Sequence, residues 1–359
     1  MRALLLVPLL IGCAQPPRRH ARPVDQAIAE GVAFLVRDQQ PDGSWGTGGD
    51  TTPWYLPDDV PGAHHAFRDA TTALSVMALR AAGETEACER GLRFLIERRY
   101  ARRSSPGQLY NVWAHCYVTQ ALATELQHDP GNETLRRACI EEVRMLDRFQ
   151  TYVGGWNYYD WSPAMSPSSM EPTSFTTAAG LIGLWEARNA GVEIPDEMLR
   201  RAIRRVEQSR FPNGAYGYGF DDRLSPSHPA NKMQGAIGRS QACNDALWLW
   251  GSLNEIDAVA GLEAFFEYHK FILIGRKRQY PHEAWFATAP YYYYFGHYYA
   301  GRLIGRLPPA ERERFAARYL ETILPYQEPG GEWWDYPMWD YHQPYGTAFA
   351  ILGLIHATR

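Results

Sequence analysis

Side chains that can transfer protons, bind anions or act as nucleophiles gather near the starts of apolar segments in this chain. Histidine exchanges protons near neutral pH, aspartate and cysteine supply acids and nucleophiles, and arginine binds phosphate or carboxylate groups. A lone buried histidine is usually structural, whereas a cluster facing a cavity favours an acid or base role. The candidate catalytic residues are His64, Asp69, His115, Arg239, Cys243, Asp245, His297 and His342.

Aromatic residues form a second candidate set, with 12 Trp, 22 Tyr and 14 Phe in the chain. The run at 291–295 indicates an aromatic-lined cavity or groove, and the long loops at 155–172 and 214–234 could cover one end of it. Trp and Tyr beside aspartate also suit sugar rings, and Asp160, Asp221 and Asp222 lie in these loops. The alternative is that the aromatics only cap the fold. The candidate ligand-binding residues are Trp113, Trp156, Trp161 and Tyr345.

A recurring turn organises the segments that must position these residues. It begins with a glutamine after an apolar helix end, passes through glycine and ends in tryptophan or tyrosine. Its copies are 39–45, 150–156, 208–216 and 327–333. The aromatic anchors are separated by one or two units of about 56 residues, which is typical of a repeat architecture.

Each repeat unit is predicted to contain two helices. The outer helices are amphipathic at helical spacing and are expected at 24–39, 87–98, 135–150, 196–209, 259–274 and 309–327. Asp196 is expected to cap one of them, and Pro309 suits a first turn. The inner helices are apolar on all sides and therefore buried, and they are expected at 71–79, 110–126, 176–184, 241–253, 292–307 and 345–354. Six such hairpins predict an all-α (α/α)6 barrel. An open solenoid is the alternative, but neither end has a polar capping repeat.

The pattern Gln-x-x-x-Gly-x-Trp after an outer helix resembles the repeat of squalene cyclases and protein prenyltransferase β subunits. The resemblance covers roughly residues 24–359 and implies an α/α toroid in which the glutamine and tryptophan are structural. The Asp-x-Asp-Asp-Thr motif of class II cyclases is absent, and so is the Cys-Gly-Glu-Gln motif of thioester domains.

The same resemblance raises the question of a zinc site. Prenyltransferases hold zinc with Asp, Cys and His, and Cys243 and His342 occupy similar places here. Position 241 is Gln where the family has Asp, so Asp245 would have to supply a third ligand. Two ligands are too few for tight zinc binding. We therefore expect no metal or other cofactor, with zinc as the alternative.

The N-terminus resembles a bacterial lipoprotein signal. Arg2 is followed by an apolar run at 3–11, and the small residue Gly12 precedes Cys13. This predicts a signal peptide at 1–13 with Cys13 as the lipidated residue, a tether at 14–23 and a toroid domain at 24–359. The expected location is the cell envelope, anchored through lipid and facing the periplasm. An ordinary signal peptide is the alternative. In an exported protein a disulfide between Cys88 and Cys139 is possible.

The favoured function is that of a terpenoid cyclase-like or prenyltransferase-like lipoprotein. Such a protein would bind or transform an elongated, isoprenoid-like ligand in the central cavity. The alternatives are a glycan-binding or glycan-degrading (α/α)6 barrel and a non-catalytic scaffold, and enzymatic activity is left open. The 36 basic and 40 acidic residues nearly balance, which argues against nucleic acid as a partner. We expect a monomer.

Overall fold

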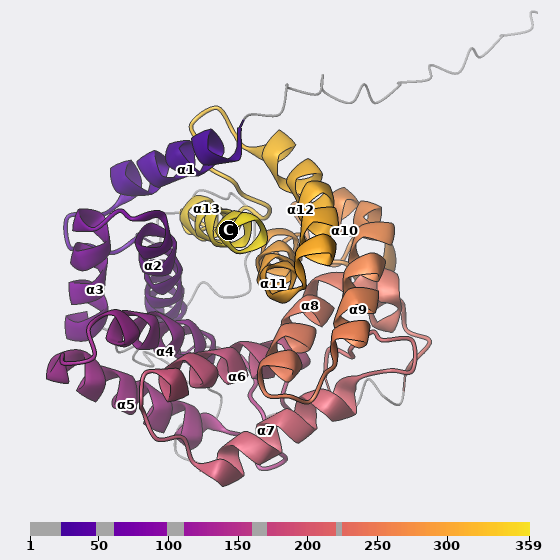
Figure 1. The fold of residues 1–359 in the computed structure, drawn as a ribbon, viewed down its shortest axis with the longest axis horizontal. Coiled ribbons are helices and arrows are strands. Elements are labelled where there is room, and N and C mark those ends of the chain that lie inside the picture. Colours follow the sequence, from indigo (N-terminus) through magenta and orange to yellow (C-terminus); the bar gives the residue numbers. More distant parts are fainter. Residues whose placement is uncertain (1–22, 48–60, 99–110, 160–170, 220–224) are drawn as a thin grey trace, which may run out of the picture.

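The computed structural model describes residues 23–47, 61–98, 111–159, 171–219 and 225–359. Within these ranges the regular elements are helices, and two isolated β-bridges pair residues of the segments between them. The helices form two concentric rings around a common axis, as Figure 1 shows. The predicted (α/α)6 barrel is confirmed.

Each of the six hairpins places one helix in the inner ring and one in the outer ring, except that the fifth has a pair of helices in the outer ring. The outer ring contains α1 (Val24–Asp38), α3 (Glu86–Arg98), α5 (Glu133–Phe149), α7 (Asp196–Ser209), α9 (Glu255–Glu267) with α10 (His269–Gly275), and α12 (Pro309–Ile323). The inner ring contains α2 (Pro61–Ala82), α4 (Asn111–His128), α6 (Ser174–Asn189), α8 (Met233–Leu249), α11 (Tyr292–Arg306) and α13 (His342–Thr358).

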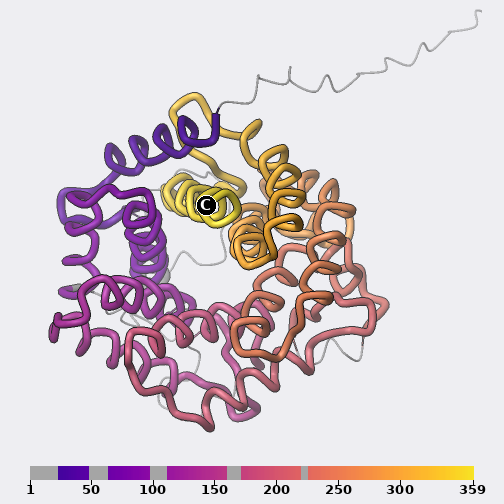
Figure 2. The backbone as a smooth tube through the Cα atoms, viewed as in Figure 1, coloured from indigo at the N-terminus to yellow at the C-terminus, as the bar shows by residue number. Residues whose placement is uncertain are grey.

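The inner ring is closed. Each inner helix packs against the next one in chain order, and α13 packs against α2. The first outer helix α1 also contacts α13, so the first and the last of the described helices lie side by side, as the tube in Figure 2 shows. Buried side chains occur on all sides of α4, α6 and α8, in keeping with helices covered by neighbours on every side.

Each complete turn motif is a corner that joins an outer helix to its inner partner. The indole N–H groups of Trp45, Trp156 and Trp333 donate to carbonyl oxygens of the preceding outer helix at 2.8, 2.7 and 3.2 Å. Their backbone N–H groups donate to a threonine hydroxyl of the following inner helix at 3.1, 3.0 and 2.9 Å. The corner tryptophans are therefore structural, as the resemblance implied.

The corner glutamines link each unit to a neighbouring one. The amide of Gln39 donates to the carbonyl of Ala87 in α3, and that of Gln150 to the carbonyl of Met198 in α7, both at 2.8 Å. Gln327 donates at 2.9 Å to the carbonyl of Ala27 in α1. The last corner thus holds the first helix and closes the ring, which excludes the open solenoid.

The corners also require a glycine. Gly43 and Gly331 have φ values of 91° and 97°, and a Cβ atom at either position would lie 2.4 Å from a carbonyl oxygen of the adjacent outer helix. Only glycine combines this left-handed conformation with so close an approach.

Several details differ from the sequence-based predictions. Asp196 is the first residue of α7 and makes no capping bond, because Pro195 occupies the N-cap position. The predicted outer helix 259–274 is divided into α9 and α10 at Tyr268. Pro309 does lie in the first turn of α12. Cys88 and Cys139 are buried and free, without a disulfide. None of the helices in the described ranges is both long and apolar enough to cross a bilayer.

Candidate functional site

A cavity of about 340 Å³ lies on the barrel axis at the end where the inner helices begin. Its wall comes from the first turns of α4, α6, α11 and α13, from α2, and from the loops that precede the inner helices. Cavities of this size accommodate small ligands. Seven of its 19 lining residues are tyrosines, and none is Asp, Glu, Lys or Arg.

The tyrosine hydroxyls at the wall are joined into hydrogen-bonded pairs. The hydroxyl of Tyr218 donates to that of Tyr158 at 2.8 Å. The hydroxyl of Tyr291 lies 3.2 Å from Nε2 of His282, the one histidine that lines the cavity. Tyr292 differs, because its buried hydroxyl has no hydrogen-bond partner. These groups could exchange hydrogen bonds with a polar ligand.

Tyr345 connects the cavity to a buried carboxylate. Its hydroxyl donates to Oδ1 of Asp335 at 2.7 Å, and the backbone N–H of Tyr294 donates to Oδ2 at 3.0 Å. Burial raises the pKa of Asp335 to about 6, and the two hydrogen bonds partly offset this shift. Asp335 was not among the predicted site residues. The only signal in the sequence was its position two residues after the corner Trp333.

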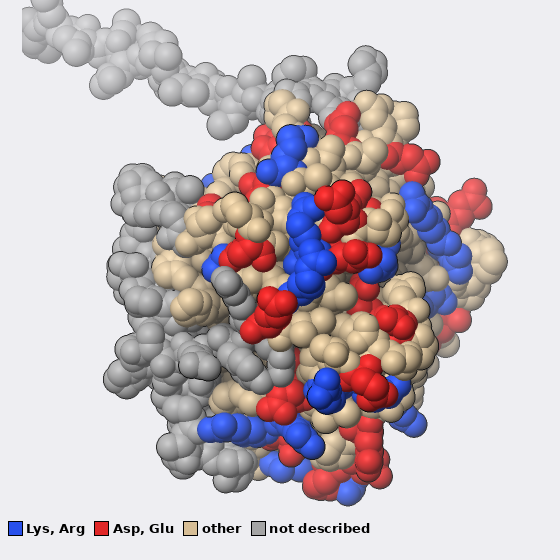
Figure 3. All heavy atoms as spheres, turned by 90° about the vertical axis from the view of Figure 1, so that its left-hand side faces the viewer, with Lys and Arg blue, Asp and Glu red and all other residues tan. Residues whose placement is uncertain are grey.

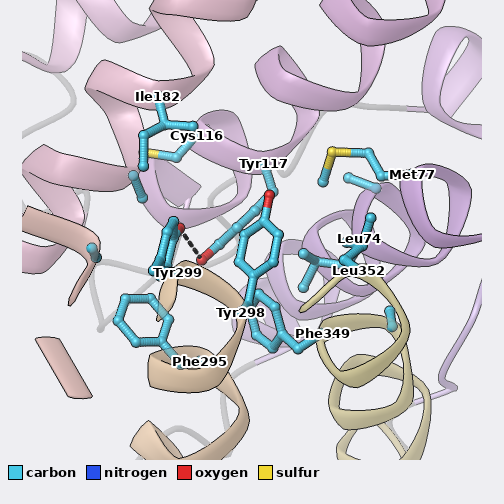
Figure 4. Packing of buried hydrophobic residues seen from close by; sticks show 14 of the residues in the cluster. Leu74, Met77, Cys116, Tyr117, Ile182, Phe295, Tyr298, Tyr299, Phe349 and Leu352 are labelled. Atoms are coloured by element: carbon cyan, nitrogen blue, oxygen red, sulfur yellow. Dashed lines mark hydrogen bonds between the residues drawn. The ribbon is translucent and has the colours of Figure 1, made fainter. Parts of the chain in front are cut away.

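The inner end of the cavity is apolar and closed. Leu74, Phe295 and Phe349 lie one turn deeper than the lining residues that precede them on α2, α11 and α13. Tyr117, Tyr298 and Tyr299 pack beneath the two phenylalanines, as Figure 4 shows. The hydroxyls of Tyr117 and Tyr299 pair with each other at 3.1 Å. The barrel axis is therefore plugged below the cavity.

Two lining residues have a strained backbone. His282 and Trp339 have φ values of 66° and 46°, which non-glycine residues rarely adopt. Such strain costs about 1–3 kcal/mol per residue and persists only where surrounding contacts enforce it. Nδ1 of His282 accordingly lies 2.8 Å from the carbonyl of Ala287. Strained residues cluster at binding and catalytic sites, so their position supports the cavity as the functional site.

Three of the predicted site residues lie at or beside the cavity. Trp113 and Tyr345 line it. His64 is half-buried next to the lining residue Trp339, with 4.5 Å between the ring centroids.

Arg239 and Cys243 do not face the cavity. The guanidinium of Arg239 is buried and donates to the carbonyls of Tyr216, Gly235 and Ala230. It therefore bonds to the backbone around the start of α8 and not to the predicted anion. Cys243 is fully buried, and burial raises the pKa of its thiol to about 12. Such a thiol is protonated at neutral pH and is therefore a poor nucleophile.

His115 and Asp69 lie in the wall between the inner ring and α5. Nδ1 of His115 is 2.6 Å from Oε2 of Glu142, and both side chains are buried. Burial and the nearby Glu142 raise the pKa of Asp69 well above its ordinary value. These groups form a buried polar cluster that does not line the cavity.

The remaining polar candidates have structural partners elsewhere. Asp245 pairs with Arg302 and Arg306 toward the C-terminal ends of the inner helices. Nε2 of His297 is 3.1 Å from Nε2 of His269, between α11 and α10. His342 packs edge-on against Trp334 with 5.2 Å between the ring centroids.

Trp156, predicted to bind ligand, is fully buried in its corner and does not line the cavity. Trp161, Cys13 and the loop carboxylates Asp160, Asp221 and Asp222 lie outside the described residues.

The zinc alternative does not fit this arrangement. Cys243, Asp245 and His342 each contact a different group of side chains. Across the ranges that the structure describes, no group of three or more His, Cys, Asp or Glu residues could hold a metal ion.

Comparison with known proteins shows the fold alone. No family model matches the chain, and no curated protein matches it. Among solved structures, an inactive variant of an α-1,6-mannanase from Salegentibacter sp. in complex with α-1,6-mannotetrose is similar, with a TM-score of 0.61 and 10% identity. The match covers 94% of this chain and 98% of that chain.

Two further solved structures are similar to this chain to different degrees. Cellobiose 2-epimerase from Bacillus thermoamylovorans has a TM-score of 0.60 and 14% identity over 92% of this chain and 98% of that chain. A type II terpene cyclase from Scytonema covers 93% of this chain and 96% of that chain, at 15% identity, but its TM-score is 0.37. The comparisons support an α/α toroid and assign no family, so the predicted membership of the cyclase and prenyltransferase family is not shown.

Proposed function

We propose that this protein binds a carbohydrate in the axial cavity. The observation that carries the proposal is the wall of seven tyrosines with Trp113 and Trp339. Aromatic rings offer flat apolar faces on which a sugar ring can stack, while tyrosine hydroxyls remain available for its hydroxyl groups. The unpaired hydroxyl of Tyr292 adds a buried group that a polar ligand could satisfy.

The fold neighbours support this choice only indirectly. By their descriptions, one binds α-1,6-mannotetrose and another is an epimerase of cellobiose. Both place carbohydrate chemistry on an α/α toroid, but their low identity transfers no residue to this chain. The proposal is therefore limited to binding.

Calorimetric titration with α-1,6-mannotetrose and cellobiose tests the proposal. Trp113→Ala should weaken binding by roughly tenfold or more, which corresponds to about 1.4 kcal/mol. Trp185→Ala is a matched control, since Trp185 is also half-buried on an inner helix but packs against Trp250, away from the cavity. Failure of both sugars to bind, or equal losses in the two variants, would contradict the proposal.

An isoprenoid-like ligand is the second candidate. It is favoured by the inner end of the cavity, where Leu74, Phe295 and Phe349 offer no hydrogen-bonding group. A lipid that copurifies with the protein and is displaced by Leu74→Asn would support it.

We also propose that the protein is located at the cell envelope. We expect Cys13 to carry lipid and to hold the protein at a membrane. The wild-type protein should enter the detergent phase on phase separation and show a lipid mass on its N-terminal peptide. Cys13→Ala should remain in the aqueous phase, and identical partitioning of the two proteins would refute lipidation.

A further inference from the structure

The cavity has two chemically different ends. Its outer wall carries Tyr158, Tyr218 and Tyr291, which are half-buried, and His282, which is exposed. Its inner end is formed by Leu74, Phe295 and Phe349, all of which are buried. The polar groups therefore lie toward the start of the inner helices, and the apolar groups lie one helical turn deeper.

A polar group on a ligand would find no partner at the inner end. Leu74, Phe295 and Phe349 carry no hydrogen-bonding group, and Tyr117, Tyr298 and Tyr299, which lie below them, do not line the cavity. The hydroxyls of Tyr117 and Tyr299 pair with each other, and that of Tyr298 accepts from Gln120 at 2.8 Å. A ligand hydroxyl pushed to this depth would be desolvated without a hydrogen bond, which is unfavourable.

The outer end has the opposite requirement. The hydroxyl of Tyr292 is buried without a partner, and the paired hydroxyls of Tyr218 and Tyr158 retain acceptor capacity. The hydroxyl of Tyr345 donates a hydrogen bond to Asp335, so its oxygen can still accept a hydrogen bond from a ligand. A purely apolar ligand would leave the hydroxyl of Tyr292 unsatisfied.

We propose that the ligand is amphipathic, with a sugar held among the outer tyrosines and an apolar chain inserted toward Leu74, Phe295 and Phe349. Alkyl and polyprenyl glycosides are the chemical class that meets both requirements. This inference rests on the proposed carbohydrate function and specifies what is attached to the sugar.

Calorimetric titration with matched glycosides tests the inference. The probes are octyl and methyl glucopyranoside, octyl and methyl mannopyranoside, and octanol, each used below its critical micelle concentration where it has one. At least one octyl glycoside should bind tenfold or more tightly than its methyl partner and than octanol. Leu74→Asn should remove most of this difference, while Leu74→Met, which conserves volume and polarity, should retain it. Thermal unfolding of both variants establishes that they are folded.

Each other outcome has a defined meaning. Equal affinity for the octyl and methyl glycosides would overturn the inference and leave the carbohydrate proposal standing. Octanol binding as tightly as the octyl glycosides would overturn the inference, because the sugar would then add nothing to the binding of the apolar chain. If no glycoside binds, the inference fails, and the oligosaccharide titration described above decides the carbohydrate proposal separately.

Discussion

Tyr345 and Asp335 form the one contact in the described wall that links the cavity to a buried carboxylate. Among the described residues, a phenol and a backbone N–H bond to this carboxylate, and the cation Arg276 acts on it only through its charge. Its pKa of about 6 places the change in protonation within the physiological range. The strength of the Tyr345 bond should therefore depend on pH.

Tyr345→Phe should destabilise the protein more at pH 8 than at pH 5. At pH 8 Asp335 is ionised, and the substitution removes the charge-assisted hydrogen bond that it accepts from Tyr345. This loss should lower the free energy of unfolding by about 1.5–3 kcal/mol. At pH 5 the carboxyl is largely protonated and needs that donor less. Urea unfolding at both pH values measures the difference. Tyr158→Phe is the control, because its hydroxyl pairs with Tyr218 and not with a carboxylate. An equal loss at the two pH values would show that Asp335 does not titrate in this range.

At the scale of the elements, the corners determine how hairpins join. Trp156 is fully buried and bonds to the helix before it and the helix after it. A ring of this size cannot be removed without leaving a cavity between α5 and α6. The corner therefore contributes to stability although it touches no part of the axial cavity.

Trp156→Ala should lower the free energy of unfolding by about 3–5 kcal/mol, as is typical for a large buried aromatic residue. Tyr152→Ala changes the same corner at a side chain that is 63% exposed, and surface changes of this kind usually remain within about 0.5 kcal/mol. Denaturant titration monitored by circular dichroism compares the two variants. A small effect of Trp156→Ala would mean that the corner is not a structural unit.

The corners were also the features that could be predicted from the sequence. Their glutamine, glycine and aromatic residues interact with the helices of their own hairpin or with an adjacent unit, so their spacing in the sequence revealed the repeat and the barrel. The fifth unit lacks such a corner, and there the single predicted helix is in fact α9 and α10.

The site was predicted less well, because the presence of a polar residue near the start of an inner helix does not reveal whether its side chain faces the cavity. Arg239, His115 and Asp245 are polar for a structural reason, since groups buried between two helical rings need partners there. The partners of His115 and Asp245, which are Glu142 and Arg302, come from other units. The lining residues Tyr345 and Phe349 follow an i, i+4 pattern that was visible in the sequence, but several helix faces showed similar aromatic patterns.

For the whole molecule, closure of the ring buries both acidic and basic side chains. On the face shown in Figure 3, acidic and basic side chains are interspersed, in keeping with a net charge of −4. Surface ion pairs such as Arg90 with Glu86 contribute little to stability. The pH dependence of folding should therefore be dominated by the buried groups.

Asp69 and His269 should shift the stability of the whole molecule in opposite directions. The pKa of Asp69 is raised in the folded state, so the native protein retains a proton that the unfolded chain releases above pH 4. This group makes the protein less stable as pH rises. Burial lowers the pKa of His269 to about 4, so between pH 4 and 6.5 the unfolded chain binds a proton that the native protein does not. This group makes the protein less stable as pH falls. Each group contributes at most about 1.4 kcal/mol per pH unit.

Asp69→Asn should therefore gain stability relative to wild type as pH rises from 4 to 7, and His269→Gln should gain as pH falls from 6.5 to 4.5. Glutamine is chosen because Nδ1 of His297 lies 2.6 Å from the carbonyl of Tyr293 and must carry the proton, which leaves its Nε2 as an acceptor for the donor that His269 provides. Urea unfolding at four pH values between 4.5 and 7.5 gives the two difference curves. Their slopes should have opposite signs. Parallel curves would mean that at least one of the two groups lacks the pKa shift that its burial implies.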